Sequence, residues 1–191
     1  MPDAETATVK WIVLYSTHYT MNVRNRNGCL VVAAVAGAVA TLAALRARAP
    51  RLLIEETESP HGFETTTERF EAAVEAAGWQ ILTVHDLQAK MDRHGYDVER
   101  TTVYEICAPE HASRILSGDA ERLVSPMMPC RVSIYEHGDG HTSLARMNTG
   151  LVAALFGGVI RRTMGDASAE SEAMIEATLD PHADPQAAVD R

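Results

Sequence analysis

The stretches EICAP (residues 105–109) and PCRV (residues 129–132) decide how the second half of this chain folds. EICAP ends the alternating, β-branched segment 101–107, which predicts a strand. Pro109 then suits the first turn of a helix. PCRV opens a second predicted strand over residues 130–137, in which Cys130 and Val132 share one face. Each stretch therefore marks the end of a strand, and each carries one cysteine.

The segments around these two strands predict further elements of the same domain. Thr65 and Glu68 have the spacing of a capping box and predict the start of a helix, which Gly78 would end. Residues 79–84 predict a strand, and residues 167–179 predict a last helix. We expect an α+β fold with one mainly antiparallel sheet and helices packed on one face.

Residues 29–45 (CLVVAAVAGAVATLAAL) contain no charged side chain. As a helix this segment would be roughly 26 Å long, which is close to the thickness of the hydrocarbon core of a bilayer. Arginines flank it on both sides, so they do not decide its orientation. The segment predicts a hydrophobic helix, Cys29–Leu45, that anchors the protein in a membrane as a single-pass span.

Two other interpretations of this segment stay open. A start at Met21 would give the layout of a secretory signal with a cleavage site after ARA (residues 47–49), and the domain would then be secreted. Pro50 would follow that cleavage site, which is unfavourable for processing. The third interpretation is a buried, alanine-rich helix of a soluble protein.

The predicted organisation has five parts along the chain. They are an N-terminal extension (1–28), the transmembrane or signal-like apolar segment (29–45), a basic linker (46–51), the folded domain (52–180) and an acidic tail (181–191).

Composition excludes several classes of function. The formal net charge is −9, and no stretch has the clustered basic side chains of a nucleic-acid-binding surface. The sequence contains no glycine-rich phosphate loop, nucleophile elbow or HExxH pattern. We therefore expect no nucleic-acid partner and no familiar type of enzyme. Three cysteines do not make a disulfide framework.

Soft ligand atoms gather around the two cysteine-containing stretches. If the strand ends lie side by side, the thiols of Cys107 and Cys130 are close together, with Met127, Met128 and His111 nearby. Thiolates, thioethers and imidazole select Cu(I) and similar ions, so these five residues form a candidate metal site. A helix N-terminus after Pro109 would lower the pKa of the Cys107 thiol. The alternative is that both cysteines are packed core residues.

Glu105 and Arg131 are the remaining candidates for ligand binding. Glu105 shares a strand face with Cys107, since the two are two residues apart. Its carboxylate would either be exposed and paired with Arg131, or buried with a raised pKa.

The chain also resembles the DUF302 domain family, whose function is unknown. The resemblance covers roughly residues 52–179, and EICAPEHA and PCRVSIYE are its most specific parts because their order and separation fit as well. Ala108 departs from the pattern, because the family more often has Asn there. The landmarks are FETT (63–66), the helix end at 77–78, ILTVHDL (81–87), Gly95, EICAPEHA (105–112) and PCRVSIYE (129–136).

The resemblance implies a TBP-like α+β fold and homodimers, and it leaves the activity open. Together with the apolar segment, it favours a membrane-anchored, non-enzymatic module that binds a small ligand or a partner. The alternative function is a thiol or soft-metal (copper-type) binding or redox protein that uses Cys107 and Cys130.

Overall fold

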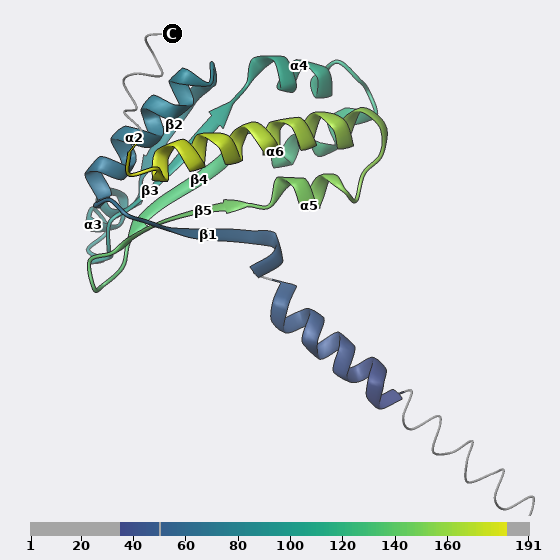
Figure 1. The fold of residues 1–191 in the computed structure, drawn as a ribbon, viewed down its shortest axis with the longest axis horizontal. Coiled ribbons are helices and arrows are strands. Elements are labelled where there is room, and N and C mark those ends of the chain that lie inside the picture. Colours follow the sequence, from purple (N-terminus) through teal and green to yellow (C-terminus); the bar gives the residue numbers. More distant parts are fainter. Residues whose placement is uncertain (1–34, 50, 183–191) are drawn as a thin grey trace, which may run out of the picture. The chain divides into compact units, whose positions relative to one another are not determined.

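The computed structural model describes residues 35–49 and 51–182 of the chain (Figure 1). It divides into two units, Met1–Ala49 and Pro50–Arg191. In the first unit, residues 35–49 are helical. Among the described residues, no helix is both long enough and apolar enough to cross a membrane. Residues 29–34, which begin the predicted Cys29–Leu45 span, lie outside the described ranges, as do most residues of the predicted acidic tail.

The second unit is built on one five-stranded sheet in which all four strand pairs are antiparallel, as predicted. The strand order is β1-β5-β4-β3-β2, which places β1 and β2 at the edges. Each strand alternates side chains between a helix-covered face and an open face. The strands are β1 (Ile54–Ser59), β2 (Gln80–Asp86), β3 (Thr101–Cys107), β4 (Cys130–Glu136) and β5 (Thr142–Met147).

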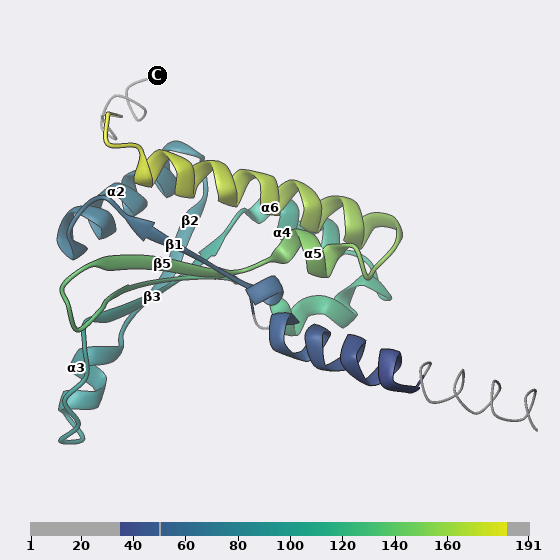
Figure 2. The ribbon, with the colours of Figure 1, turned by 60° about the horizontal axis from the view of Figure 1, so that its bottom comes forward.

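Helices α2 and α6 lie across one face of this sheet, as Figures 1 and 2 show. Two of the predicted local signals are confirmed, since Gly78 follows α2 with a φ of 74° and Pro109 begins α4. The Asp86 side chain accepts a hydrogen bond from the Ala89 amide at the start of α3. The helices are α2 (Phe63–Ala76), α3 (Leu87–Asp92), α4 (Pro109–Leu116), the 3₁₀ helix η1 (Glu121–Met127), α5 (Thr149–Ala153) and α6 (Gly158–Leu179).

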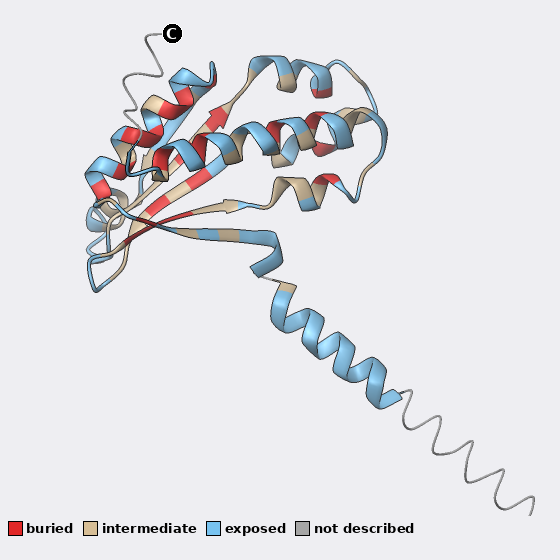
Figure 3. Ribbon diagram, viewed as in Figure 1, coloured by how far each residue is buried: buried red, intermediate tan, exposed pale blue. Residues whose placement is uncertain are grey.

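The hydrophobic core lies between the sheet and the two long helices (Figure 3). Tyr104 is 2% exposed, and its ring meets the Phe70 ring edge-on with 5.2 Å between centroids. Burial of such large apolar side chains is the main contribution to the stability of a domain of this size. The sheet contributes Tyr104, Ile106, Val132, Ile134 and Leu144, and the helices contribute Phe63, Phe70, Ala73, Val74, Ala167, Met174 and Ile175.

The predicted capping box at Thr65 and Glu68 is wrong, because α2 begins earlier. The Thr66 amide already donates a helical hydrogen bond to the Gly62 carbonyl at 2.9 Å, and Gly62 is the N-cap residue, without a side-chain cap. An earlier start also places the Phe63 ring in the core, where it is 8% exposed. Burial of this ring outweighs the local capping preference.

The last helix also begins earlier than predicted. Residue 167 was the expected start, whereas α6 begins at Gly158. The additional turns bury Thr163, which is 3% exposed, and bring Met164 to the wall of a pocket. At the other end of the domain, residues 51–53 are helical and β1 begins at Ile54.

Candidate functional site

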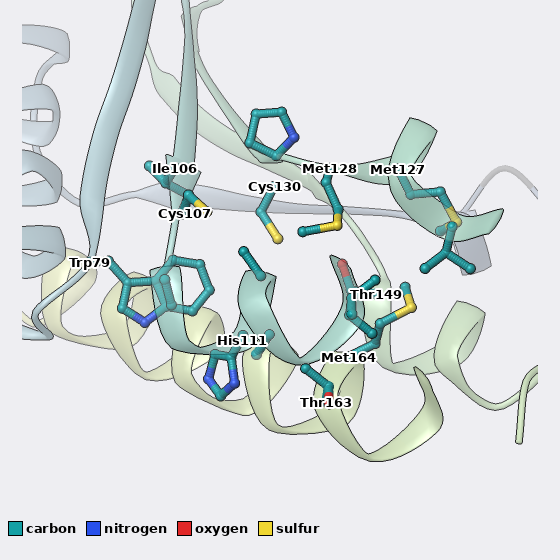
Figure 4. Close-up of a pocket in the computed structure, with 16 residues that line it drawn as sticks. Trp79, Ile106, Cys107, His111, Met127, Met128, Cys130, Thr149, Thr163 and Met164 are labelled. Atoms are coloured by element: carbon teal, nitrogen blue, oxygen red, sulfur yellow. The ribbon is translucent and has the colours of Figure 1, made fainter. Parts of the chain in front are cut away.

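A pocket lies where the end of β3 and the start of β4 meet α4, η1 and α6 (Figure 4). Its volume is ≈ 60 Å³, which suits a few water molecules or a single ion rather than a large organic molecule. Apolar atoms make up almost all of its wall. The lining residues are Trp79, Ile106, Cys107, Ala108, His111, Ala112, Ile115, Val124, Met127, Met128, Pro129, Cys130, Thr149, Thr163, Met164 and Ala167.

Strand pairing brings the two cysteine-containing stretches together. Ile106 of β3 lies opposite Cys130 of β4 in the antiparallel register. Cys107, the next residue of β3, therefore lies one position beyond the partner of Cys130, and both residues line the pocket at these strand ends. The chain then turns into α4, where the N-cap residue Ala108 makes no side-chain hydrogen bond to the helix.

Five sulfur-containing side chains line this pocket, and four of them are predicted candidates. Figure 4 shows the sulfur atoms of Cys107, Cys130 and Met128 directed toward the same part of the pocket. Met127 of η1 and Met164 of α6 line the same pocket. The sequence did not suggest Met164, because this residue precedes the predicted last helix (167–179), whereas the observed α6 includes it.

Both thiols are held in the protonated form at neutral pH. Burial raises the pKa of Cys107, and it raises the pKa of Cys130 with a further contribution from the neighbouring Cys107 thiol. The prediction of a lowered pKa for Cys107 is therefore wrong, because desolvation of the thiol by burial raises its pKa. Neither residue forms a disulfide in the described structure.

His111 lines the same pocket but lies at its opposite end, below Trp79 (Figure 4). Its Nε2 atom is 2.9 Å from Oε1 of Glu170 in α6. Trp79 Nε1 donates to Oε2 of the same carboxylate at 2.9 Å. These hydrogen bonds lower the pKa of Glu170, and the one from Trp79 has the largest effect. His111 Nδ1 is buried and has no hydrogen-bond partner among the described residues.

The other two candidates, Glu105 and Arg131, lie opposite each other on the open face of the sheet. Arg131 donates from Nε and Nη2 to Glu105 Oε1 at 3.1 and 3.0 Å. This hydrogen bonding lowers the pKa of Glu105. Of the two predicted alternatives, Glu105 therefore has the one in which its carboxylate is paired with Arg131. His85 Nε2 lies 3.5 Å from the same carboxylate, and Lys90 Nζ lies 2.8 Å from His85 Nδ1.

A metal site of the usual zinc or calcium type is absent from the described part of the chain. No three side chains of His, Cys, Asp or Glu lie close enough together there to hold an ion. The pocket lined by the five sulfur-containing side chains, the sulfur pocket, offers two thiols and three thioethers as ligands for a soft ion. Thioethers bind soft ions such as Cu(I) far better than hard ions.

Comparisons with known proteins agree with the fold. A family model described as "Domain of unknown function DUF302" matches residues 55–180. The chain is similar to a crystal structure of an uncharacterized conserved protein DUF302 from Bacillus stearothermophilus, with a TM-score of 0.59 and 19% sequence identity. That match covers 66% of this chain and 98% of the other. A comparison with curated proteins found no match. Because the family model spans well over half of its length, this chain belongs to the DUF302 family.

Proposed function

We propose that this DUF302 domain is a non-enzymatic binding module whose sulfur pocket holds a soft monovalent metal ion. The ion that we propose is Cu(I). One observation carries the proposal: a single small pocket gathers two thiols and three thioethers. We expect Cys107, Cys130 and Met128 to be the ligands, because their sulfur atoms are directed toward the same part of the pocket (Figure 4). Met127 and Met164 would line the way to it.

The walls of the pocket favour a soft ion over a hydrated one. An apolar lining cannot replace the water shell of Mg²⁺ or Ca²⁺, whose ligands are oxygen atoms. Cu(I) forms strong bonds to thiolate and thioether sulfur. The buried thiols must lose protons to bind it, so the metal competes with protons for the site.

A small apolar molecule is the second candidate occupant of the same pocket. The raised pKa of each thiol favours it, because uncharged thiols behave as small apolar groups. Such a molecule would depend on the shape of the pocket, whereas a metal ion would depend on the sulfur atoms.

Titration of the reduced protein with Cu(I), against a chromophoric competitor, tests the proposal. We expect one ion per chain in the wild type and a loss of at least about tenfold in affinity for Cys107→Ala, Cys130→Ala and Met128→Leu. Met91→Leu is the matched control, since Met91 lies in α3 and does not line the pocket. Thermal melting of each variant checks that it is folded. Wild-type affinity in the two folded cysteine variants would exclude the metal site and favour the apolar ligand.

We further propose that Cys29–Leu45 anchors the domain in a membrane as a single span. The support is its run of seventeen residues without a charge between flanking arginines. Val39→Arg places a charge near the middle of the segment, which costs about 3 kcal/mol in a bilayer. The variant should move from the alkali-resistant membrane fraction to the soluble fraction, whereas Val98→Arg in the folded domain should not. A soluble wild-type protein whose N-terminus starts after residue 49 would favour secretion after cleavage instead.

We also propose that the domain forms homodimers, as the family resemblance implies. The edge strand β2 is a suitable surface, since Leu82 and Val84 are 51% and 48% exposed and the strand has no charged side chain before Asp86. Uncharged apolar edges invite pairing with another strand. Sedimentation velocity should show a dimer that Leu82→Lys dissociates and that Leu155→Lys, at an exposed position outside the sheet, leaves intact. A monomeric wild-type protein would exclude the dimer.

A further inference from the structure

A second, larger cavity adjoins the sulfur pocket. Its volume is ≈ 390 Å³, and it extends along the open face of the sheet past Val103, Ser133 and Ala145. The two cavities share several wall residues: Met127, Pro129, Cys130, Thr149 and Met164. An ion held by Cys130 in the sulfur pocket would therefore have space for a further, organic ligand on the side of the larger cavity.

The larger cavity differs from the sulfur pocket in its chemistry, because two arginines line it. Arg146 uses four of its five N–H donors within the domain: it bonds to Glu172 through Nε and Nη2, to Thr57 through Nη1, and its Nη2 lies 3.3 Å from Glu55. Arg131 uses Nε and Nη2 on Glu105, and its Nη1 has no partner among the described residues. Arg131 is also 57% exposed on its side chain, so an incoming ligand can reach it.

The charges around Arg131 favour an anion. The connected polar groups on this part of the sheet are Lys90, His85, Glu105 and Arg131. This chain of contacts contains one carboxylate, Glu105, and two cationic groups, Arg131 and Lys90, so with His85 neutral it has a formal excess of one positive charge. A planar carboxylate is the natural partner for a guanidinium group that still has free N–H donors.

We propose that the metal is bound together with a small thiol that carries a carboxylate. This inference rests on the proposed metal function. The thiol of the small molecule loses its proton to solvent as its sulfur atom binds the ion, and its carboxylate accepts hydrogen bonds from Arg131 in the larger cavity. The protein thus recognises the metal in the form of its complex with a small anionic thiol.

Calorimetric titration of the Ag(I)-loaded full-length protein tests this inference, with Ag(I) as an air-stable substitute for Cu(I). The two titrants are 3-mercaptopropionate and 3-mercaptopropan-1-ol, which have chains of equal length but differ in charge. We expect the carboxylate compound to bind about fivefold more tightly, as a partly exposed charge-assisted hydrogen bond allows. Arg131→Gln should remove this preference without changing the affinity for Ag(I) alone. Arg122→Gln, at an exposed arginine outside the cavity, should retain it.

The possible failures are distinguishable. A wild-type protein that does not bind Ag(I) would contradict the metal function itself, and the inference would fall with it. Ag(I) binding followed by equal affinities for the two thiols, or a carboxylate preference that persists in Arg131→Gln, would overturn the inference and leave the metal site standing. Removal of Ag(I) from the protein by both thiols, without a ternary complex, would also overturn it.

Discussion

Replacement of Arg69 by methionine tests how α2 holds the C-terminal end of α6. Arg69 is a buried cation, 9% exposed. Its Nε donates to the Thr178 carbonyl at 2.8 Å, and its Nη2 donates to the carbonyls of Ala177 and Asp180. These carbonyls belong to the last turn and the cap of α6, where no further N–H donors of the helix are available to satisfy them. Methionine keeps much of the apolar stem but removes every donor.

The size of the effect follows from these contacts. Hydrogen bonds from a charged donor contribute about 1.5–3 kcal/mol to stability, and a cation at a helix C-terminus adds about 0.3–1 kcal/mol. The carbonyls lie at the end of the helix, where water can replace part of what is lost. We therefore expect Arg69→Met to lower the free energy of unfolding by about 2–3 kcal/mol. For a domain of this size, the midpoint of thermal unfolding should fall by about 8–12 °C.

Urea unfolding followed by circular dichroism measures this change. Arg122→Met is the matched control, because Arg122 is exposed and its one ion pair within the described residues is with Asp119, three residues away in the chain. Its loss should cost less than about 0.5 kcal/mol. Arg69→Lys keeps the charge but has fewer donors, so its stability should fall between the wild type and Arg69→Met. Equal stabilities for Arg69→Met and Arg122→Met would refute the reasoning.

Three further predictions concern other parts of the domain. Because burial raises the pKa of both pocket thiols, the Cu(I) affinity should rise with pH by at least about tenfold per unit from pH 6 to 8; a pH-independent affinity would argue against thiolate ligands. Asp86→Ala removes the cap of α3 and should cost about 1 kcal/mol in urea unfolding, whereas Asp92→Ala at the end of the same helix should cost less. Burial and a hydrogen bond to Glu56 raise the pKa of Tyr135 to about 12, so Glu56→Gln should lower it in an ultraviolet titration, and an unchanged value would show that Glu56 has no part in it.

Much of the sheet could be predicted from the sequence because its signals are local. The alternation in residues 101–107 and 130–136 reflects one buried and one open face, and both strands have nearly the predicted ends. The start of α6 could not be predicted in this way. Gly158 and Gly165 have low helix propensity and weaken the local helix signal. The first turns of α6 are stabilised instead by packing against the rest of the domain, where Thr163 is buried.

The candidate site was predictable in part. The sequence placed Cys107 and Cys130 at strand ends, and the β3–β4 register then brought them to one pocket. Glu170 was missed because it contacts His111 across 59 residues of chain, and no local pattern indicates such a contact. The thiol pKa was predicted with the wrong sign, since the sequence shows the helix start but not the depth of burial.

Copper K-edge X-ray absorption of the Cu(I)-loaded protein tests the central claim most directly, because it identifies the atoms bound to the ion. The account predicts a stoichiometric ion with only sulfur in its first shell, from Cys107, Cys130 and a methionine. A first shell that contains nitrogen would place the ion at His111 or elsewhere and contradict the proposed ligand set. Failure of the reduced protein to retain copper would contradict the metal site itself.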